Sequence, residues 1–192
     1  MSKIAFLLDN IFEDSEFRVP YDRLRSAGHQ VEIVGVEAGK EVTGYRGKEK
    51  VKIEKAARDV SENDYDALVI PGGYSPDRLR VNIDAVRLTR NMATANKPVA
   101  AVCHAPWMLV EADLVDGVNV TSWPSVKTDL INAGARWVDR QVVIDGNIIT
   151  SRKPDDLEAF SNAILEMLEK GVPQRAEPAR APEAASDRPA VY

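Results

Sequence analysis

Cysteine and histidine are scarce in this sequence of 192 residues, which has one cysteine, Cys103, and two histidines, His29 and His104. A single cysteine excludes an internal disulfide. One thiol and two imidazoles are also too few for a typical zinc site, so we expect neither a bound metal nor another cofactor. Any thiol chemistry of this chain therefore has to use Cys103.

The sequence also lacks a long apolar segment and an excess of positive charge. No apolar run approaches the length of a membrane-spanning helix. The first run, residues 4–8, is too short for a signal peptide and is followed by Asp9. The formal net charge is −5, so no dedicated nucleic-acid surface is expected. These absences make a cytoplasmic location the default expectation, without contact with a membrane.

Four short apolar runs predict the buried strands of one sheet, at residues 4–8, 31–36, 67–70 and 99–102. Runs that are nearly continuous and rich in β-branched residues are typical of parallel strands covered on both faces. Four segments with polar and helical patterns follow them, at residues 13–27, 84–95, 105–112 and 155–169. The alternation predicts an α/β fold of flavodoxin-like type, with a doubly wound, mostly parallel sheet between two layers of helices.

Smaller features complete this prediction. Residues 42–45 and 51–53 read as a hairpin, and residues 118–121, 136–138, 142–144 and 148–150 as short strands. Pro20 predicts a bend in the first helix, and Gly28 its end. In the last helix, one apolar face is expected to contain Leu157, Phe160, Ile164, Leu165 and Leu168. Residues 1–170 are thus expected to form one domain, and residues 171–192, rich in Ala and Pro, a tail.

Cys103 stands where a predicted strand ends and a helix begins. The segment reads Val102-Cys103-His104-Ala105-Pro106, which is the strand–turn–helix context of a nucleophile elbow. Such a turn presents its side chain at the carboxyl edge of the sheet, and the helix N-terminus favours the thiolate. The alternative is a buried, unreactive cysteine, which is the usual fate of this residue type. The elbow context favours a nucleophile, with the neighbouring His104 as proton acceptor.

Two other strand ends carry groups that belong at the same edge. After residues 67–70 comes Pro71-Gly72-Gly73, where the N–H of Gly73 can pair with that of His104 to bind an oxyanion. The alternative is a plain β-to-helix turn. After the first strand comes Glu13, whose carboxyl group would have a raised pKa if it lay buried beside the thiol. The alternative is that Glu13 and Asp14 only begin a helix.

Several motifs taken together resemble the PfpI family, within the class I glutamine-amidotransferase-like superfamily that also contains the Parkinsonism-associated deglycase. The resemblance runs from residue 3 to about residue 170. Its markers are Phe12-Glu13-Asp14, Pro71-Gly72-Gly73 with Pro76, Val102-Cys103-His104, Thr121-Ser122-Trp123-Pro124, Ile131-Asn132-Ala133-Gly134 and Ser151-Arg152. The combination is far more specific than any one of these motifs.

The resemblance implies a role for each matching residue. Cys103 matches the family nucleophile and His104 its neighbouring histidine. Glu13 matches the protonated acid that hydrogen-bonds the cysteine. Gly73 and His104 match the oxyanion-hole amides. Asp77 matches an acid, usually Glu, that reaches the histidine from an adjacent subunit, so a homo-oligomer of at least two chains is implied. Tyr74, Trp123 and Arg152 are the residues expected to contact substrate.

Three departures from the family pattern bear on this assignment. The family commonly has Gly where this chain has Ala105, and Tyr where it has Trp123, and both changes alter the space for substrate. Asp77 is shorter than the usual Glu. Glutamine amidotransferases proper use a histidine far downstream of the cysteine, and no histidine follows His104 here. A glutaminase triad is therefore not expected.

Two functions remain open from the sequence, and a third has little support. The first is a cysteine-dependent stress-response hydrolase, which acts as a deglycase or glyoxalase on methylglyoxal or glyoxal adducts of small molecules, proteins or peptides, or as a peptidase. The second is a redox sensor or protective protein that uses an oxidisable Cys103. The third is a flavodoxin-like binder, which lacks a visible phosphate-binding loop. The first two use the same thiol, so spacing cannot separate them.

Overall fold

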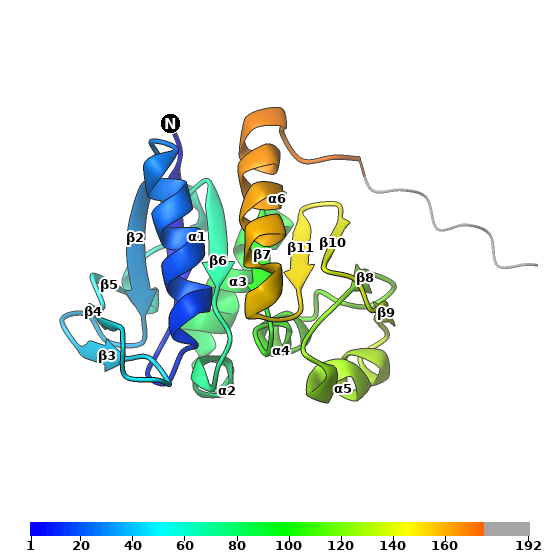
Figure 1. Cartoon of the computed structure of the whole chain (residues 1–192), viewed down its shortest axis with the longest axis horizontal. Helices are drawn as coiled ribbons and strands as arrows, with labels where there is room; N and C mark the ends of the chain where they lie inside the picture. Colours follow the sequence, from blue (N-terminus) through cyan, green and yellow to red (C-terminus); the bar gives the residue numbers. More distant parts are fainter. Residues whose placement is uncertain (175–192) are drawn as a thin grey trace, which may run out of the picture.

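One seven-stranded sheet organises the chain, whose computed structural model describes residues 1–174 (Figure 1). The strand order is β10-β11-β7-β6-β1-β2-β5, and β10 is the antiparallel strand of this sheet. The strands are β1 (Lys3–Leu7), β2 (Gln30–Gly35), β5 (Lys55–Ala56), β6 (Ala67–Ile70), β7 (Val99–Val102), β10 (Val142–Asp145) and β11 (Ile148–Ser151). Two small sheets pair β3 (Glu41–Thr43) with β4 (Lys50–Lys52), and β8 (Asn119–Val120) with β9 (Arg136–Trp137).

Helices cover both faces of the sheet. One face carries α1 (Asp14–Ser26) and α6 (Leu157–Lys170), and the other carries α3 (Ile83–Thr94) and α4 (Pro106–Glu111) (Figure 1). Shorter helices are α2 (Ser75–Leu79) and α5 (Lys127–Asn132). Single 3-10 turns occur at Ala57–Asp59, Glu62–Asp64, Pro124–Val126 and Pro154–Asp156. The predicted three-layer, flavodoxin-like α/β sandwich is confirmed.

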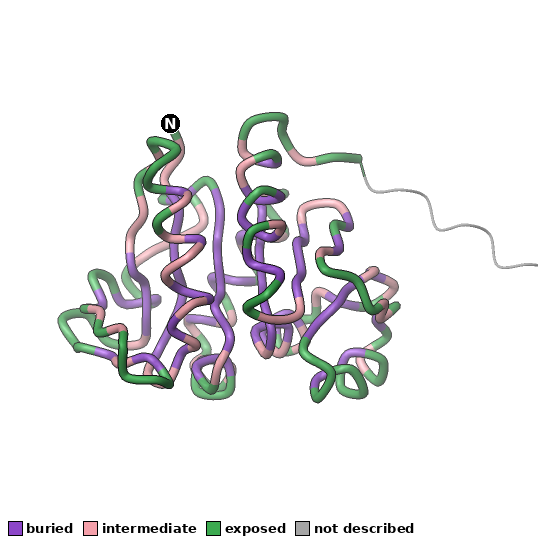
Figure 2. The backbone as a smooth tube through the Cα atoms, viewed as in Figure 1, coloured by how far each residue is buried: buried purple, intermediate pink, exposed green. Residues whose placement is uncertain are grey.

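The alternation of side chains along each strand divides the core in two. In β1, Ile4 and Phe6 pack toward α1 and α6, whereas Ala5 and Leu7 pack toward α3 and α4. All four residues are fully buried, and the purple centre of Figure 2 follows these strands. Burial of a Phe-sized or Leu-sized side chain contributes about 1.5–3 kcal/mol. The two cores therefore fix the register of the central strands, and with it the edge where their carboxyl ends meet.

Most predicted elements lie within one or two residues of the observed ones. Helix α1 continues through Pro20 to Ser26 and ends in a Schellman motif. In that motif, Gly28 has φ +87° and the N–H of His29 donates to the carbonyl of Leu24 at 3.1 Å. The hairpin of β3 and β4 is also as predicted. In α6, Leu165 and Leu168 are only half-buried and Met167 is buried instead. Helix α5, helix α2 and strand β5 were not predicted, because they are too short to show an apolar period.

The predicted boundary near residue 170 coincides with the end of α6, where Gly171 has φ +85°. Residues 175–192 of the predicted tail lie outside the described residues. The division into a domain of residues 1–170 and a tail of residues 171–192 therefore stays a prediction. Among the described residues, no helix is both long and apolar enough to span a membrane.

Candidate active site

Cys103 occupies the sharp turn between β7 and α4 that the sequence predicts. Its backbone is left-handed, with φ +63°, which is unfavourable for a residue that has a Cβ atom. Two hydrogen bonds hold it there. The N–H of Cys103 donates to the carbonyl of Ser151 at 3.0 Å, and the carbonyl of Cys103 accepts from the N–H of Trp123 at 2.9 Å. The surrounding chain thus maintains a strained backbone, as is common at functional sites.

The turn after β6 approaches the sulfur from the neighbouring strand. Gly73 has φ +74° and pairs with Phe12 in an isolated antiparallel bridge. At Gly72, a Cβ atom would lie 2.7 Å from Cβ of Cys103, so only glycine fits there. The backbone N–H groups of Gly73 and His104 hydrogen-bond the Cys103 thiol and favour its ionised form. The two predicted oxyanion-hole donors therefore converge on one sulfur.

The carboxyl group beside the thiol belongs to Glu16, which corrects the prediction of Glu13. Glu16 is fully buried, and its Oε2 accepts from the N–H of Gly72 at 2.8 Å. Glu16 and the thiol of Cys103 influence each other's pKa, and the buried Oε1 of Glu16 has no hydrogen-bond partner among the described residues. Burial raises the pKa of Glu16 to about 8, although the bonds to Gly72 and Cys103 oppose the rise. Glu16 is thus a neutral acid at neutral pH.

Glu13 lies at the mouth of the same cavity and has other partners. It precedes the first residue of α1, accepts a hydrogen bond from Ser15 Oγ at 3.2 Å, and lies 3.4 Å from Nε of Arg46. The helix begins here, so Glu16 falls on its first turn, where the side chain turns toward the core. A sequence signal for Glu16 does exist. It shares the i, i+4 stripe of Pro20 and Leu24, where a carboxyl group is out of place unless it has a function.

The thiol is buried, and burial is the largest influence on its ionisation. Cys103 is 8% exposed. Burial raises the pKa of its thiol, and an ionised Glu16 would raise it further by repulsion. A protonated Glu16 removes that repulsion and can donate a hydrogen bond to the thiolate while it keeps its proton, so the charge of the pair is confined to the thiolate. Ionisation of Cys103 therefore depends on Glu16 staying neutral and on a base that takes up the proton.

His104 is placed to be that base. Its Nδ1 lies 3.2 Å from Sγ of Cys103, and its Nε2 lies 3.3 Å from Oγ of Ser125. The ring is half-buried and lies between the indoles of Trp107 and Trp123, at centroid distances of 5.3 and 6.4 Å. Burial lowers the pKa of His104, so the imidazole is neutral at neutral pH and can accept a proton.

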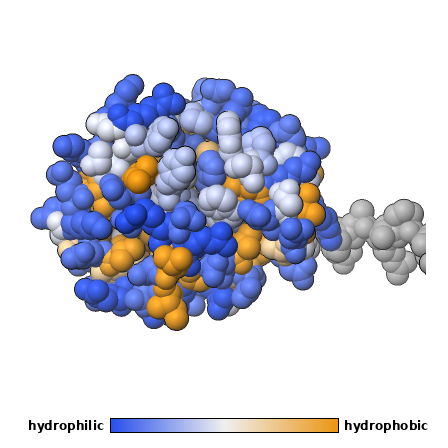
Figure 3. Space-filling view, turned by 90° about the horizontal axis from the view of Figure 1, so that it is seen from below, coloured by the Kyte–Doolittle hydropathy of each residue, from blue (hydrophilic) through white to orange (hydrophobic). Residues whose placement is uncertain are grey.

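A cavity of about 340 Å³ opens above these groups. Cys103, His104 and Glu16 line it, and the predicted substrate residues Tyr74 and Trp123 are 60% and 39% exposed at its wall. Sequence reasoning missed three further lining residues: Pro154, and Tyr45 and Arg46 from the loop between β3 and β4. Nothing in the sequence shows that this loop folds over the sheet edge. The face seen in Figure 3 is mostly polar, with apolar residues in small separate areas.

Two predicted site residues lie elsewhere. Arg152 does not line the cavity, because its guanidinium donates to Asp156 at 2.8 Å and to Asp139 at 2.6 Å. The expectation that Arg152 contacts substrate is therefore wrong for this conformation. Asp77 is exposed on α2, and within the described part of the chain the groups that contact His104 do not include it. Its predicted role needs a second chain.

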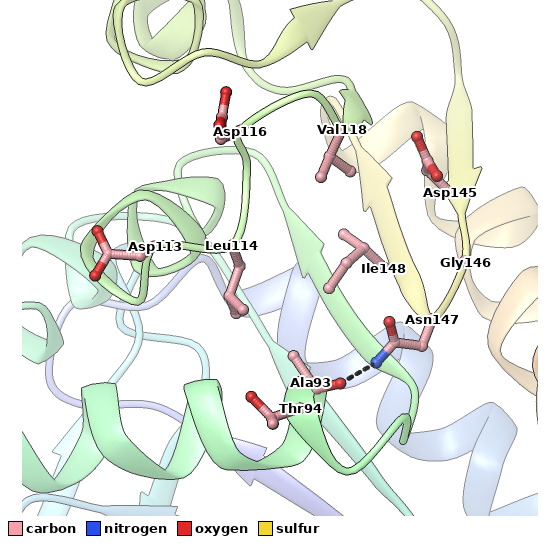
Figure 4. A pocket seen from close by; sticks show the side chains of 10 residues that line it. All are labelled: Ala93, Thr94, Asp113, Leu114, Asp116, Val118, Asp145, Gly146, Asn147 and Ile148. Atoms are coloured by element: carbon pink, nitrogen blue, oxygen red, sulfur yellow. Dashed lines mark hydrogen bonds between the residues drawn. The ribbon is translucent and has the colours of Figure 1, made fainter. Parts of the chain in front are cut away.

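A separate cavity of about 280 Å³ lies at the opposite edge of the sheet, where β7 and β11 begin (Figure 4). Asp113, Asp116 and Asn147 are among its lining residues, and Asn147 donates to the carbonyl of Ala93 at 2.9 Å. Its lining residues include no cysteine and no histidine. Across residues 1–174, no group of three or more His, Cys, Asp or Glu side chains is placed to hold a metal ion. The cavity above Cys103 is therefore the candidate active site.

Comparisons with known proteins identify the family and the fold of this chain. A family model described as the DJ-1/PfpI family matches residues 2–167. The putative cysteine protease YraA of Bacillus subtilis is 48% identical over 166 residues, which are 86% of this chain and 98% of that protein. Deglycase PfpI of Pyrococcus furiosus is 44% identical over 166 residues, which are 86% of this chain and 99% of that protein.

A solved structure shows the same fold. It is a two-domain protein from Anabaena variabilis with DJ-1/ThiJ/PfpI-like and ferritin-like domains, and it matches with a TM-score of 0.87 at 38% identity. The match covers 88% of this chain and 48% of that one. With the family model spanning nearly all described residues and relatives aligned over their full length, the chain belongs to the DJ-1/PfpI family.

Proposed function

We propose that this chain is a cysteine-dependent hydrolase with deglycase or glyoxalase-like action on methylglyoxal or glyoxal adducts, in a stress response. The observation that carries the proposal is the convergence on one sulfur of a neutral acid, Glu16, a neutral base, His104, and two N–H groups. The names of two relatives, a deglycase and a putative cysteine protease, support hydrolase-type activity.

The groups around Cys103 support the first steps of such a reaction. The thiolate of Cys103 attacks a carbonyl carbon, and the electron pair of the C=O bond moves to oxygen, where the N–H groups of Gly73 and His104 stabilise it. With an adjacent ketone, as in methylglyoxal, the C–H bond at the former aldehyde carbon then breaks and the hydrogen is returned to the neighbouring ketone carbon. The aldehyde carbon is thereby oxidised to a thioester while the ketone is reduced to an alcohol. No external oxidant is needed. Water then hydrolyses the thioester and regenerates the thiol, with His104 carrying the proton.

The partners in this proposal are small dicarbonyl compounds or glycated proteins and peptides. Tyr74 and Trp123 at the cavity wall are proposed to contact them. We also propose a homo-oligomer in which Asp77 of one chain approaches His104 of another. A thiol nucleophile has to stay reduced, which fits the cytoplasm.

The test is turnover of methylglyoxal and of a fluorogenic peptide by the wild type and by Cys103→Ser. We expect dicarbonyl turnover that disappears in Cys103→Ser, because the hydroxyl is a far weaker nucleophile at this site. Turnover of the peptide alone would make the chain a peptidase. Activity that survives in Cys103→Ser would contradict the proposal.

A second candidate is a redox sensor, and one observation favours it. Glu16 lies next to Cys103, and its buried Oε1 has no hydrogen-bond partner among the described residues, so a protonated carboxyl group there can hydrogen-bond an oxygen added to the sulfur. If neither substrate is turned over in a Cys103-dependent manner, while mild peroxide adds two oxygens to Cys103 quantitatively, this candidate replaces the first.

A further inference from the structure

A second cavity adjoins the one above Cys103. It has a volume of about 370 Å³, and Glu13, Arg46 and Pro154 line both cavities. Cys103 and His104 line only the first. A substrate whose carbonyl carbon lies at the sulfur therefore reaches Arg46 where the two cavities meet, and a longer substrate continues into the second.

The size of these cavities favours an adduct over the free dicarbonyl. Cavities of roughly 300–1,000 Å³ hold ligands of drug size, and the two here have volumes of about 340 and 370 Å³. Methylglyoxal is far smaller and would leave most of the first cavity empty. A dicarbonyl joined to an amino acid or to a small thiol compound fills it better.

Some charged side chains of the second cavity already have strong partners within the chain. Arg18 donates to Glu49 at 2.6 Å and to Asp22 at 3.1 Å. The carboxylate of Asp14 accepts hydrogen bonds from backbone N–H groups of the loop between β3 and β4. These groups have little capacity left for a ligand.

Arg46 and Lys48 are exposed cations of the second cavity whose charge is not matched in this way. Nε of Arg46 lies 3.4 Å from Glu13, whereas the guanidinium of Arg152 donates to carboxylates at 2.6 and 2.8 Å. Within residues 1–174, the ammonium group of Lys48 has no ion pair. A guanidinium has five N–H donors, so the outer edge of Arg46 is left to bind an anion.

We propose that Arg46 is a specificity-determining residue, which binds a carboxylate of the substrate while Cys103 attacks the carbonyl carbon. The preferred substrates are then adducts of methylglyoxal or glyoxal with amino acids or small thiol compounds that have a free carboxylate. The inference rests on the proposed function and names the substrate class of the same site.

A carboxylate fits this position better than a group with two negative charges. A guanidinium forms two parallel hydrogen bonds with a carboxylate. Lys48 adds a second positive charge, but Glu13 and Glu49 also line the second cavity. A dianionic phosphate would therefore meet more repulsion than one carboxylate.

The loop between β3 and β4 holds Arg46 by its backbone and leaves its side chain exposed. The N–H of Arg46 donates to the carboxylate of Asp14 at 2.7 Å. Arg46→Ala keeps that N–H, so the variant should fold and keep the loop in place. His104 does not line the second cavity, so the proposed approach of Asp77 from a second chain to His104 is separate from this subsite.

The first experiment compares two alkylating reagents that differ only in charge, N-iodoacetylglycine and its neutral amide. Mass spectrometry measures the rate at Cys103 of the full chain, and each rate is divided by that of the same reagent with mercaptoethanol. We expect the wild type to prefer the carboxylate about tenfold, between the effects of an exposed ion pair and of a hydrogen bond to a charged group.

Arg46→Ala should abolish this preference and leave the rate with the neutral amide unchanged. Arg46→Lys keeps the charge but loses the planar fork, so it should retain part of the preference. The matched control is Lys50→Ala, which removes an exposed positive charge from β4, just after the same loop. Lys50 lines neither cavity, so this variant should behave as the wild type.

Turnover gives a second readout that a merely structural role would not move. The substrates are the methylglyoxal adducts of N-acetylcysteine, which has a carboxylate, and of N-acetylcysteinamide, which has none. Arg46→Ala should raise KM about tenfold for the first adduct, with kcat unchanged, and should leave both constants unchanged for the second.

The possible failures are distinguishable. A wild type that reacts equally with both reagents overturns the inference, and so does a preference for the carboxylate that survives in Arg46→Ala. Slower alkylation of Arg46→Ala by both reagents also overturns it, because Arg46 would then act on the thiol. If neither adduct shows Cys103-dependent turnover while the alkylation preference depends on Arg46, the proposed function fails, and Arg46 is still a carboxylate-binding residue beside Cys103.

Discussion

Glu16 shows at the residue scale how burial sets the chemistry of the site. Its carboxyl group has a pKa of about 8 in the folded chain, against an ordinary value of 4.5 for an exposed glutamate, because burial penalises the carboxylate. The folded state therefore binds a proton that the unfolded chain has already released between these two pH values. The stabilising effect of this difference is complete below pH 4.5 and is lost as the pH rises through 8.

We predict that Glu16→Gln removes this dependence on pH. The unfolding free energy of the wild type should fall relative to that of Glu16→Gln between pH 4.5 and 8, by at most about 5 kcal/mol. Urea unfolding at several pH values measures the difference. Glu13→Gln, at the cavity mouth, is the control and should follow the wild type. Parallel curves for the wild type and Glu16→Gln would show that Glu16 ionises normally in the folded chain.

The sequence predicts part of this site and misses the rest for identifiable reasons. Cys103, His104 and Gly73 follow buried strands directly, so their position at the sheet edge is readable from the apolar runs. Glu16 lies one helical turn after Glu13, inside α1. The direction of its side chain depends on the residue at which α1 begins, and a sequence locates that residue only within a few positions. Arg152 was misassigned because a motif does not show that its guanidinium is already paired with two carboxylates.

At the scale of elements, the sequence predicts strands and helices correctly where apolar residues form a run or recur at a regular period. Strands β6 and β7 were predicted with their observed bounds, because apolar runs between polar segments define them. The loop between β3 and β4 was predicted only as a hairpin connection. Its packing over the cavity depends on a contact between residues more than 30 positions apart, which local patterns do not contain.

Asp14 makes that contact. Its carboxylate accepts hydrogen bonds from the backbone N–H groups of Arg46, Lys48 and Glu49, at 2.7–2.8 Å. Burial alone would raise the pKa of Asp14, but these bonds outweigh burial and lower it, so the carboxylate is ionised at neutral pH. Gly44 permits the approach, since a Cβ there would lie 2.5 Å from the carboxyl group.

We predict that Asp14→Ala releases this loop. Arg46 and Lys48 are trypsin sites, so limited digestion should cleave the variant within the loop much faster than the wild type. The variant should also lose about 1–3 kcal/mol of stability, because three N–H groups in part-buried hydrogen bonds lose their acceptor. Asp22→Ala is the control, since Asp22 is exposed on the same helix and pairs only with Arg18. Equal cleavage of the two variants would mean that other contacts hold the loop.

At the scale of the whole molecule, the open question is whether one chain makes a complete site. Within residues 1–174, the Nε2 of His104 already has a partner in Ser125, while the proposed second acid, Asp77, is exposed on α2. Val81 and Ile83, which follow α2, are 85% and 79% exposed. In the proposed homo-oligomer, these residues are candidates for the contact with the second chain.

We predict that Asp77→Ala lowers turnover and that Cys103→Ser subunits restore part of it. In a mixed dimer, one site combines an intact Cys103 with the Asp77 of the other chain. Equal mixing should recover about a quarter of the wild-type sites, because half of the dimers are mixed and each has one complete site. The control replaces Cys103→Ser by the double variant Asp77→Ala/Cys103→Ser, which supplies no acid and should rescue nothing. If mixing restores no activity although the subunits exchange, Asp77 acts within its own chain or not at all, and the site does not need an acid from a second chain.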